Sequence, residues 1–303
     1  MQDFLQNNLK LCIPPRKTSG REDLGLSELK LCFQDGKLSL IDQNKSQDAL
    51  RLGNFCALLQ LTAEKHSIPN CEFILNLYEG VYEDGMASRL AYTAKPNSGH
   101  FLIPDSHNFA TVQKIDSLER ADIPFAQKKK NACFYGSDTG NRRKDGWTMR
   151  SLVSYTYKDS PLVTSKLTSL DADIGRLNFD PQTIYDSPKD LAEQLQSQVI
   201  LNINGNSTSW ERLLWAMASN SLCVFIKPFD GEEMYSWYYP LLEATGCVPM
   251  VEYDRLETFM QNDFSAEFWQ EKIKNQKIFA KFVGSLDVQA LFLAKVLEFY
   301  VRA

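Results

Sequence analysis

The chain has 303 residues, of which 44% are hydrophobic, and a formal net charge of −5 at neutral pH. Such a chain is long and apolar enough for two modest domains, each with its own core. The acidic balance argues against broad electrostatic capture of nucleic acid, because proteins that bind the phosphate backbone usually carry a strong basic excess. Any anion that the protein binds must therefore be held by local groups.

The seven cysteines are odd in number, show no C-x-x-C spacing, and mostly lie in apolar stretches. This usage is typical of unpaired thiols in a reducing compartment. The start "MQDFLQNNLK" lacks the basic and apolar regions of a signal peptide, and no apolar run approaches about 18 residues. We therefore expect a cytoplasmic protein whose contact with the membrane is at most peripheral, on its cytoplasmic face.

The first third of the chain predicts a helix followed by a buried strand. Apolar residues of "DALRLGNFCALLQLTAEKHS" (48–67) approximate helical spacing, and the run "CEFILNLY" (71–78) follows the turn "IPN". A second short strand is expected at "HFLIPD" (100–105), and a polar, helix-like stretch leads on towards residue 125.

From about residue 130, short apolar strands alternate with helices of 10 to 15 residues. The expected strands are "ACFYG", "VILNI", "SLCVFI" and "CVPMV"; the expected helices are "WTMRSLVSYTY", "SPKDLAEQLQ", "WERLLWAMAS", "EEMYSWYYPLLEAT" and those of the terminal region. This alternation is the signature of a parallel sheet covered by helices on both faces. We therefore predict an α/β protein of two lobes, with the linker near residues 120–130.

The segment "NINGNSTSWER" (202–212) stands at a strand-to-helix turn, where open parallel sheets bind ligands. Asn204 and Gly205 suit a close backbone approach, and Ser209 is a good N-cap for a helix that begins at Trp210. Free N–H groups at such a helix start attract phosphate. The alternative is an ordinary turn with a cap, because the segment matches neither a Walker A loop nor a G-x-G-x-x-G fingerprint.

A second turn of the same kind, "FYGSDTGNRRK" (134–144), follows another apolar strand. It offers two hydroxyls, two glycines that let the backbone close in, and two guanidinium groups that can grip a diphosphate. These candidate residues are Gly136, Ser137, Thr139, Gly140, Arg142 and Arg143. A solvated basic turn is the alternative, but two such turns together favour a nucleotide-type ligand.

Carboxylates follow the strand "FILNLY" at Glu79, Glu83 and Asp84. A carboxylate at the end of a strand is well placed to act as a general base, although acidic surface loops are common. The three histidines are scattered without metal-ligand spacing, and no G-x-S-x-G motif is present. The sequence therefore predicts neither a metal site nor a serine nucleophile.

Three stretches together carry a resemblance: "IPFAQKKKNACFYGSDTG", "NINGNSTSWERLL", and the segment from "SLCVFIKP" through "WYYPLLEATGCVPMVEYDRLE". In this order the chain resembles glycosyltransferase family 90, which includes LpsA-type lipopolysaccharide-core transferases, capsule xylosyltransferases and Rumi-like O-glucosyltransferases. The resemblance runs from "EFILNLYEG" to the end of the chain and implies a GT-B-like fold of two Rossmann-type lobes. It implies an acceptor-side lobe (1–125), a nucleotide-sugar donor lobe (126–284) and a terminal helix (285–303) packing back on the body.

The resemblance also implies site residues. The implied donor-binding residues are Gly136, Ser137, Thr139, Arg142, Arg143, Gly205, Asn206, Ser209, Trp210, Arg212 and Lys227. The implied catalytic base is Glu79, with Asp84 as the alternative. Three positions depart from the family pattern: Tyr135 stands where arginine is common, and Asn204 and Glu79 stand where aspartate is usual.

From this resemblance we expect an inverting glycosyltransferase that moves a sugar from a UDP-sugar to a hydroxyl of a bacterial surface glycan or glycolipid, such as the lipopolysaccharide core. No cofactor is expected and no metal is required, because basic side chains and helix N-termini can replace the cation. The alternatives are a transferase that uses another nucleotide donor and a non-catalytic protein of the same fold that binds a nucleotide or glycan.

Overall fold

The computed structural model describes most of the chain, in two compact units. The described residues are 1–13, 28–43, 49–77, 88–105, 115, 117–118, 122–170, 179–206, 210–230, 233–262 and 265–302, with only the backbone described for Trp210 and Ala266. Unit 1 comprises Met1–Val112, Glu233–Thr245 and Lys281–Ala303; unit 2 comprises Gln113–Glu232 and Gly246–Ala280. The domain boundaries expected at residues 125 and 284 stay predictions.

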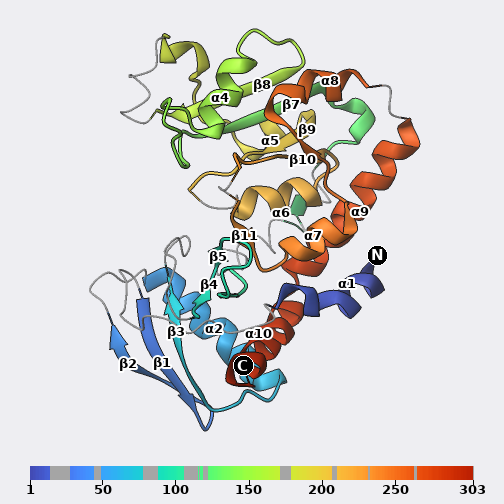
Figure 1. Cartoon of the computed structure of the whole chain (residues 1–303). Helices are drawn as coiled ribbons and strands as arrows, with labels where there is room; N and C mark the ends of the chain where they lie inside the picture. The colour runs from blue at the N-terminus through green and yellow to red at the C-terminus, as the bar shows by residue number, and fades with distance from the viewer. Residues whose placement is uncertain are drawn as a thin grey trace. The chain divides into compact units, whose positions relative to one another are not determined.

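Unit 1 is built on a five-stranded sheet with the strand order β2-β1-β3-β4-β6 (Figure 1). Its strands are β1 (Glu28–Gln34), β2 (Lys37–Gln43), β3 (Cys71–Asn76), β4 (Leu90–Ala91) and β6 (Phe101–Leu102). The pairs β3/β4 and β4/β6 are parallel, whereas β1 runs antiparallel to both β2 and β3. The strands expected at 71–78 and 100–105 are confirmed as β3 and β6.

The hairpin β1–β2 makes this sheet mixed. Its two-residue turn has positive φ at both positions, 51° at Asp35 and 79° at Gly36, a geometry that matches the twist of paired antiparallel strands and that Asp-Gly adopts readily. The register pairs Phe33 with Leu38 and Leu31 with Leu40. The prediction of a Rossmann-type lobe in this part of the chain is therefore not confirmed.

The helices of unit 1 come from both ends of the chain. The 17-residue helices α2 and α10 pack on each other (Figure 1), and the predicted helix in 48–67 is confirmed as α2. The helical elements are α1 (Gln2–Asn8), η1 (Leu9–Cys12), α2 (Ala49–Lys65), α7 (Tyr239–Thr245) and α10 (Leu286–Arg302). Apolar side chains on one side of α10, including Leu293 and Leu297, are buried, as its amphipathic pattern predicts.

The predicted helix "EEMYSWYYPLLEAT" is wrong in its first half. Tyr235–Ser236 forms strand β11, which pairs antiparallel with β5 (Thr93–Ala94), and helix α7 begins only at Tyr239. Aromatic residues fit an extended, half-buried strand as well as a helix. Pro240 then takes a position in the first turn, where proline is tolerated because its missing N–H would have no helical partner there.

A buried ion pair in unit 1 links the first residue of β1 to the residue before β4. The Nε of Arg89 donates to Oε1 of Glu28 at 2.9 Å, and both side chains are at most 2% exposed. The side-chain amide of Asn76 donates to the same oxygen at 3.0 Å. The backbone N–H of Arg89 donates to Nδ1 of His100 at 3.3 Å. Burial lowers the pKa of the His100 imidazole to about 4, and the Arg89 charge adds to this effect.

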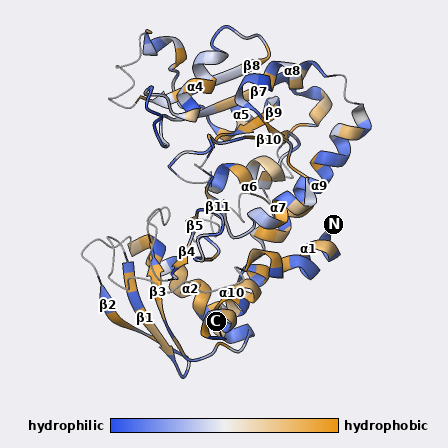
Figure 2. Cartoon of the chain, in the orientation of Figure 1, coloured by the Kyte–Doolittle hydropathy of each residue, from blue (hydrophilic) through white to orange (hydrophobic). Residues whose placement is uncertain are grey.

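Unit 2 contains a fully parallel sheet with the strand order β12-β10-β9-β7-β8 (Figure 1). Its strands are β7 (Lys129–Ser137), β8 (Val163–Ser169), β9 (Ser197–Asn202), β10 (Leu222–Ile226) and β12 (Met250–Val251). Every residue of β10 is buried, and β9 and β10 are hydrophobic along most of their length (Figure 2). This confirms the prediction of a parallel sheet for this half of the chain; β8 was not predicted.

Helices follow the strands of unit 2. The helical elements are η2 (Phe125–Gln127), α4 (Met149–Thr156), η4 (Pro181–Ile184), α5 (Leu191–Gln194), α6 (Trp210–Ala218), η5 (Tyr253–Arg255), α8 (Leu256–Gln261) and α9 (Ala266–Gly284). Helix α4 connects β7 to β8, and α6 connects β9 to β10, in the opposite direction along the sheet. Because such crossovers are right-handed, the two helices cover opposite faces of the sheet.

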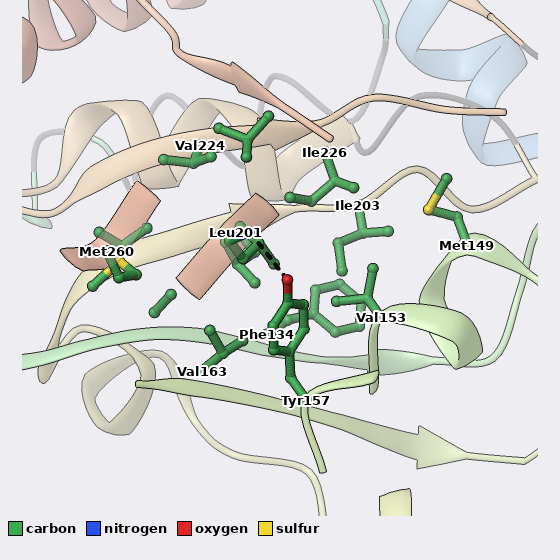
Figure 3. Close-up of a cluster of buried hydrophobic side chains, with 14 of the residues drawn as sticks. Phe134, Met149, Val153, Tyr157, Val163, Leu201, Ile203, Val224, Ile226 and Met260 are labelled. Atoms are coloured by element: carbon green, nitrogen blue, oxygen red, sulfur yellow. Dashed lines mark hydrogen bonds between the residues drawn. The ribbon is translucent and has the colours of Figure 1, made fainter. Parts of the chain in front are cut away.

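One apolar cluster fills the α4 face of this sheet (Figure 3). Phe134, Leu201 and Val224 of three adjacent strands meet Val153 of α4 there, and all four side chains are fully buried. Truncating a buried leucine such as Leu201 to alanine typically lowers the free energy of unfolding by about 2–5 kcal/mol. This cluster therefore gives the strand ends of unit 2 a rigid base.

The seven cysteines form no disulfide, as predicted. Burial raises the pKa of the Cys12 thiol to about 12 and raises that of Cys133 as well, so these thiols are poor nucleophiles. Among the described residues, no helix is long and apolar enough to cross a membrane.

Candidate functional site

The loop after β7 begins with a glycine that its surroundings require. A Cβ on Gly136 would lie 2.7 Å from the ring of Phe134 and 3.2 Å from a guanidinium nitrogen of Arg212. Gly140, further along the loop, has φ +127°, a conformation that side chains rarely tolerate. Both glycines were predicted from the turn pattern, and both allow the backbone to pass close to its neighbours.

Asp138 organises this loop from inside. Its carboxylate accepts hydrogen bonds from the Thr148 hydroxyl at 2.6 Å and from Nη2 of Arg142 at 2.8 Å, and Asp138 is only 3% exposed. Nη1 of Arg142 also donates to the carbonyl of Gly146 at 2.8 Å. Arg142, which was expected to contact a diphosphate, therefore braces the loop that would bind it.

Arg143, the next residue, lies at the surface. Its side chain is 42% exposed and forms an ion pair of 2.8 Å with Asp145. Its guanidinium carbon also lies 4.9 Å from the ring centre of Phe229, in the loop after β10. A surface ion pair of this kind contributes little to stability, so Arg143 can exchange Asp145 for an anionic ligand at small cost.

The loop after β9 meets the loop after β7. The side-chain oxygen of Asn206 accepts a hydrogen bond from the backbone N–H of Gly140 at 3.0 Å. A Cβ on Gly205 would lie 2.6 Å from Oγ1 of Thr139, so a larger residue here would have to push the Thr139 side chain aside. The structure thus brings together Thr139, Gly205 and Asn206, three of the predicted donor-binding residues.

Arg150, in the first turn of α4, ties the two loops together. Its Nη1 donates to the carbonyl of Ser137 at 3.0 Å and to the hydroxyl of Thr139 at 2.7 Å. Its Nε and Nη2 donate to the carbonyl of Ile203 at 3.1 and 3.0 Å. The guanidinium also lies over the ring of Phe134, 5.4 Å from its centre. These contacts fix the spacing between the ends of β7 and β9.

Sequence reasoning missed Arg150. One signal was available: Thr148 caps α4, which places Arg150 in the first turn of the helix, where a positive charge opposes the helix dipole. Because the dipole disfavours a cation in that position, the Arg150 guanidinium is expected to have acceptor groups close by. Phe229 was also missed, because nothing in its local sequence indicates that it lies beside Arg143.

The two loops stand at the topological switch point of the sheet. From β7 the chain moves to β8 on one side, whereas from β9 it moves to β10 on the other. The helices that follow these two strands therefore cover opposite faces of the sheet, and the loops that lead to them meet at the strand ends. In open parallel sheets such a switch point, at the carboxyl ends of the strands, is where ligands bind.

Two further predicted donor-binding residues lie elsewhere in unit 2. Lys227, at the end of β10, is 46% exposed and pairs with Glu252 at 2.6 Å. Arg212 of α6 donates to the carbonyl of Tyr135 at 2.5 Å and stacks over Phe134, with its guanidinium carbon 4.6 Å from the ring centre. Burial lowers the pKa of Arg212 to about 10. These contacts place Arg212 beneath the loop after β7 as an anchor of its backbone.

The remaining predicted residues cannot be placed. Glu79, Asp84 and Ser209 lie outside the described residues, and of Trp210 only the backbone, at the start of α6, is described. Within the described ranges, no group of three or more histidine, cysteine, aspartate or glutamate side chains could hold a metal ion.

Comparisons with known proteins show neither the family nor the function of this chain. No family model matches the chain, and no curated protein matches it, so membership of glycosyltransferase family 90 stays a prediction. Among solved structures, the chain is similar to α,α-trehalose 6-phosphate synthase from Burkholderia multivorans, with 12% identity and a TM-score of 0.36, over 72% of this chain and 51% of that one. The chain thus spans about half the length of that protein, and a likeness this distant carries no argument.

Proposed function

We propose that this protein is a glycosyltransferase that takes its sugar from a nucleoside diphosphate sugar, with a UDP-sugar as the expected donor. One observation carries the proposal: two polar, glycine-containing loops meet at the switch point of a parallel sheet and are held there by Arg150. A diphosphate fits such a site, because backbone N–H groups and guanidinium groups supply the hydrogen bonds and positive charge that its oxygens accept.

In this proposal, Arg143 binds the diphosphate directly and Arg150 positions the loops around it. Inverting transfer is a single displacement: the acceptor hydroxyl loses its proton to a base as its oxygen attacks the anomeric carbon, and the bond from that carbon to the diphosphate breaks. Negative charge then builds on the leaving diphosphate. Preformed donors at the switch point stabilise that charge without reorganising.

The base and the acceptor come from the sequence resemblance. Glu79, with Asp84 as the alternative, is the expected base, since both follow β3 in the chain. General-base catalysis of this kind contributes about 10²–10⁴-fold in rate. The expected acceptor is a hydroxyl of a bacterial surface glycan or glycolipid, such as the lipopolysaccharide core.

Calorimetric titration with UDP, with ADP and GDP in parallel, tests the donor part of the proposal. We expect UDP to bind, and Arg143→Ala to weaken its binding about ten-fold, which corresponds to about 1.4 kcal/mol for one lost charge-assisted contact. Arg255→Ala is the matched control, because Arg255 is also exposed and paired only weakly, at 4.0 Å from Asp254. Unchanged UDP affinity in Arg143→Ala would remove that residue from the site.

Transfer itself is tested with Glu79→Gln. Release of free UDP from a UDP-sugar, measured with a membrane glycan extract as acceptor, should fall at least 100-fold in this variant if Glu79 is the base. If the wild-type protein binds UDP but releases no free UDP from a UDP-sugar with any acceptor, it is the non-catalytic binding protein instead. Tighter binding of ADP or GDP than of UDP would point to a transferase with another nucleotide donor.

A further inference from the structure

A buried amide at the switch point has no partner. Asn202 is the last residue of β9, its side chain is fully buried, and neither Nδ2 nor Oδ1 makes a hydrogen bond. Its neighbours Leu201 and Ile203 both point into the apolar cluster (Figure 3). Because side chains alternate along a strand, Asn202 projects to the other face of the sheet.

An amide in this state destabilises the protein. A buried polar group without a partner costs free energy that an apolar side chain of the same size would avoid, and such groups are rare in native proteins. The same unit satisfies another buried amide completely: Oε1 of Gln276 accepts from the backbone N–H of Cys223 at 2.9 Å, and its Nε2 donates to the carbonyls of Cys223 and Cys247 at 2.9 and 3.0 Å. The fold can therefore satisfy a buried amide here, whereas both polar atoms of the Asn202 amide stay without a partner.

A second unpartnered oxygen lies two residues further on. Oδ1 of Asn204, in the loop after β9, is buried and accepts no hydrogen bond. Between the two asparagines, the carbonyl of Ile203 accepts two bonds from Arg150. The end of β9 therefore presents two amide oxygens that need donors, beside the guanidinium that spaces the loops.

The missing donors identify the chemistry of the ligand. An ionised diphosphate offers only acceptor oxygens, so it cannot satisfy Oδ1 of either asparagine. The edge of a uracil base offers a single N–H. A hydroxyl group both donates and accepts, so a ligand with several hydroxyls can satisfy both oxygens and the Nδ2 of Asn202 together.

We propose that Asn202 and Asn204 bind hydroxyl groups of the ligand at the switch point, so that this edge of the sheet selects a polyhydroxylated molecule and not merely a phosphate. This inference rests on the proposed function for the identity of the ligand, a nucleotide sugar. Asn202 then contributes to the choice of ligand, and its unpartnered amide lowers the stability of the free protein.

The stability part is tested without any ligand, by thermal unfolding of Asn202→Leu and Gln276→Leu. We expect Asn202→Leu to raise the melting temperature by roughly 2–4 °C, because an apolar group replaces an unpartnered amide. Gln276→Leu should lower it by at least as much, because it removes the three hydrogen bonds that the Gln276 amide makes to backbone groups of Cys223 and Cys247. Equal destabilisation by both variants would overturn the inference and make Asn202 a structural amide.

The binding part compares pyrophosphate with UDP-glucose, UDP-galactose and UDP-xylose by calorimetry. For the sugar nucleotide that the wild type binds best, Asn202→Leu should lose at least ten-fold in affinity, while its affinity for pyrophosphate stays within two-fold. Equal losses for both probes, or no loss for either, would overturn the hydroxyl assignment. If the wild type binds none of the nucleotides, the proposed function fails, and the unfolding comparison still decides whether Asn202 is held at the expense of stability.

Discussion

Each unit holds a buried or partly buried arginine, and the two are held in different ways. In unit 1, Arg89 is fully buried against the carboxylate of Glu28. In unit 2, Arg150 is partly buried and donates to carbonyl and hydroxyl oxygens of two loops. The first arrangement neutralises charge inside a core, whereas the second fixes the distance between two strand ends. We therefore expect changes at Arg89 to show in stability and changes at Arg150 to show in ligand binding.

The largest effect should come from breaking the pair in unit 1. Glu28→Ala removes a carboxylate partner of the buried Arg89 guanidinium, and breaking a buried pair in this way typically lowers the free energy of unfolding by about 3–5 kcal/mol. Urea unfolding monitored by circular dichroism measures this. Glu298→Ala, which breaks the exposed pair between Glu298 and Arg302 on α10, is the control and should change stability by less than about 1 kcal/mol. Similar values for both variants would contradict the structural role of Arg89.

The next largest effect concerns His100, which lies beside the same pair. Its pKa is lowered from 6.5 to about 4 in the folded protein, so the unfolded chain binds the proton more readily. The contribution of His100 to stability is therefore complete above pH 6.5 and is lost as the pH falls towards 4, by about 3 kcal/mol in all. His100→Asn should flatten this part of the curve of unfolding free energy against pH. An unchanged curve would show that another group causes the pH dependence.

In unit 2, Arg150→Ala should weaken UDP binding by about 10- to 100-fold, because the two loops lose the bonds that set their spacing and the ligand must order them. Arg150→Lys keeps the charge, but a lysine cannot donate to the carbonyls of Ser137 and Ile203 together as the guanidinium does. We therefore expect its UDP affinity to fall nearly as much as that of Arg150→Ala. Calorimetry measures both variants. Full affinity in Arg150→Lys would mean that Arg150 acts only through its charge.

The smallest effects should come from two glycines that receive the same change. Gly205→Ala places a methyl group against Thr139 and Arg150, so UDP affinity should fall by about five-fold, roughly 1 kcal/mol. Gly53→Ala, in the second turn of α2, meets no atom within 4 Å and should stabilise the protein by about 0.5–1 kcal/mol. Differential scanning calorimetry with and without UDP separates the two. A tolerated Gly205→Ala would show that the loops need not approach so closely.

The sequence predicted those elements whose patterns are local. Continuous apolar runs marked β9 and β10, and the glycine turns after β7 and β9 marked the loops that meet at the switch point. The hairpin β1–β2 was missed, although Asp35 and Gly36 carry a turn signal, because β2 is exposed along nearly its whole length and shows no buried alternation. Tyr235 was assigned to a helix because its pairing with Ala94 depends on a distant segment.

The site was predicted less completely than the fold. The loop residues, including Thr139, Gly205 and Asn206, could be predicted because a turn is recognised from a few consecutive residues in the sequence. Arg150 was missed because its partners lie on two strands that only the folded sheet brings together. The missing partners of Asn202 are likewise visible only in three dimensions, since an asparagine at the end of a strand looks like any other turn residue in sequence.

The division of unit 1 into three stretches of chain, with the last beginning at Lys281, also bears on biosynthesis. During translation, helix α2 emerges more than 200 residues before α10, the helix on which it packs. Unit 1 therefore cannot finish folding until the ribosome has delivered α10, whereas all strands of unit 2 are already available. We expect chains truncated at residue 280, and held on the ribosome by an added linker long enough to span the exit tunnel, to contain a protease-resistant unit 2 and an accessible unit 1.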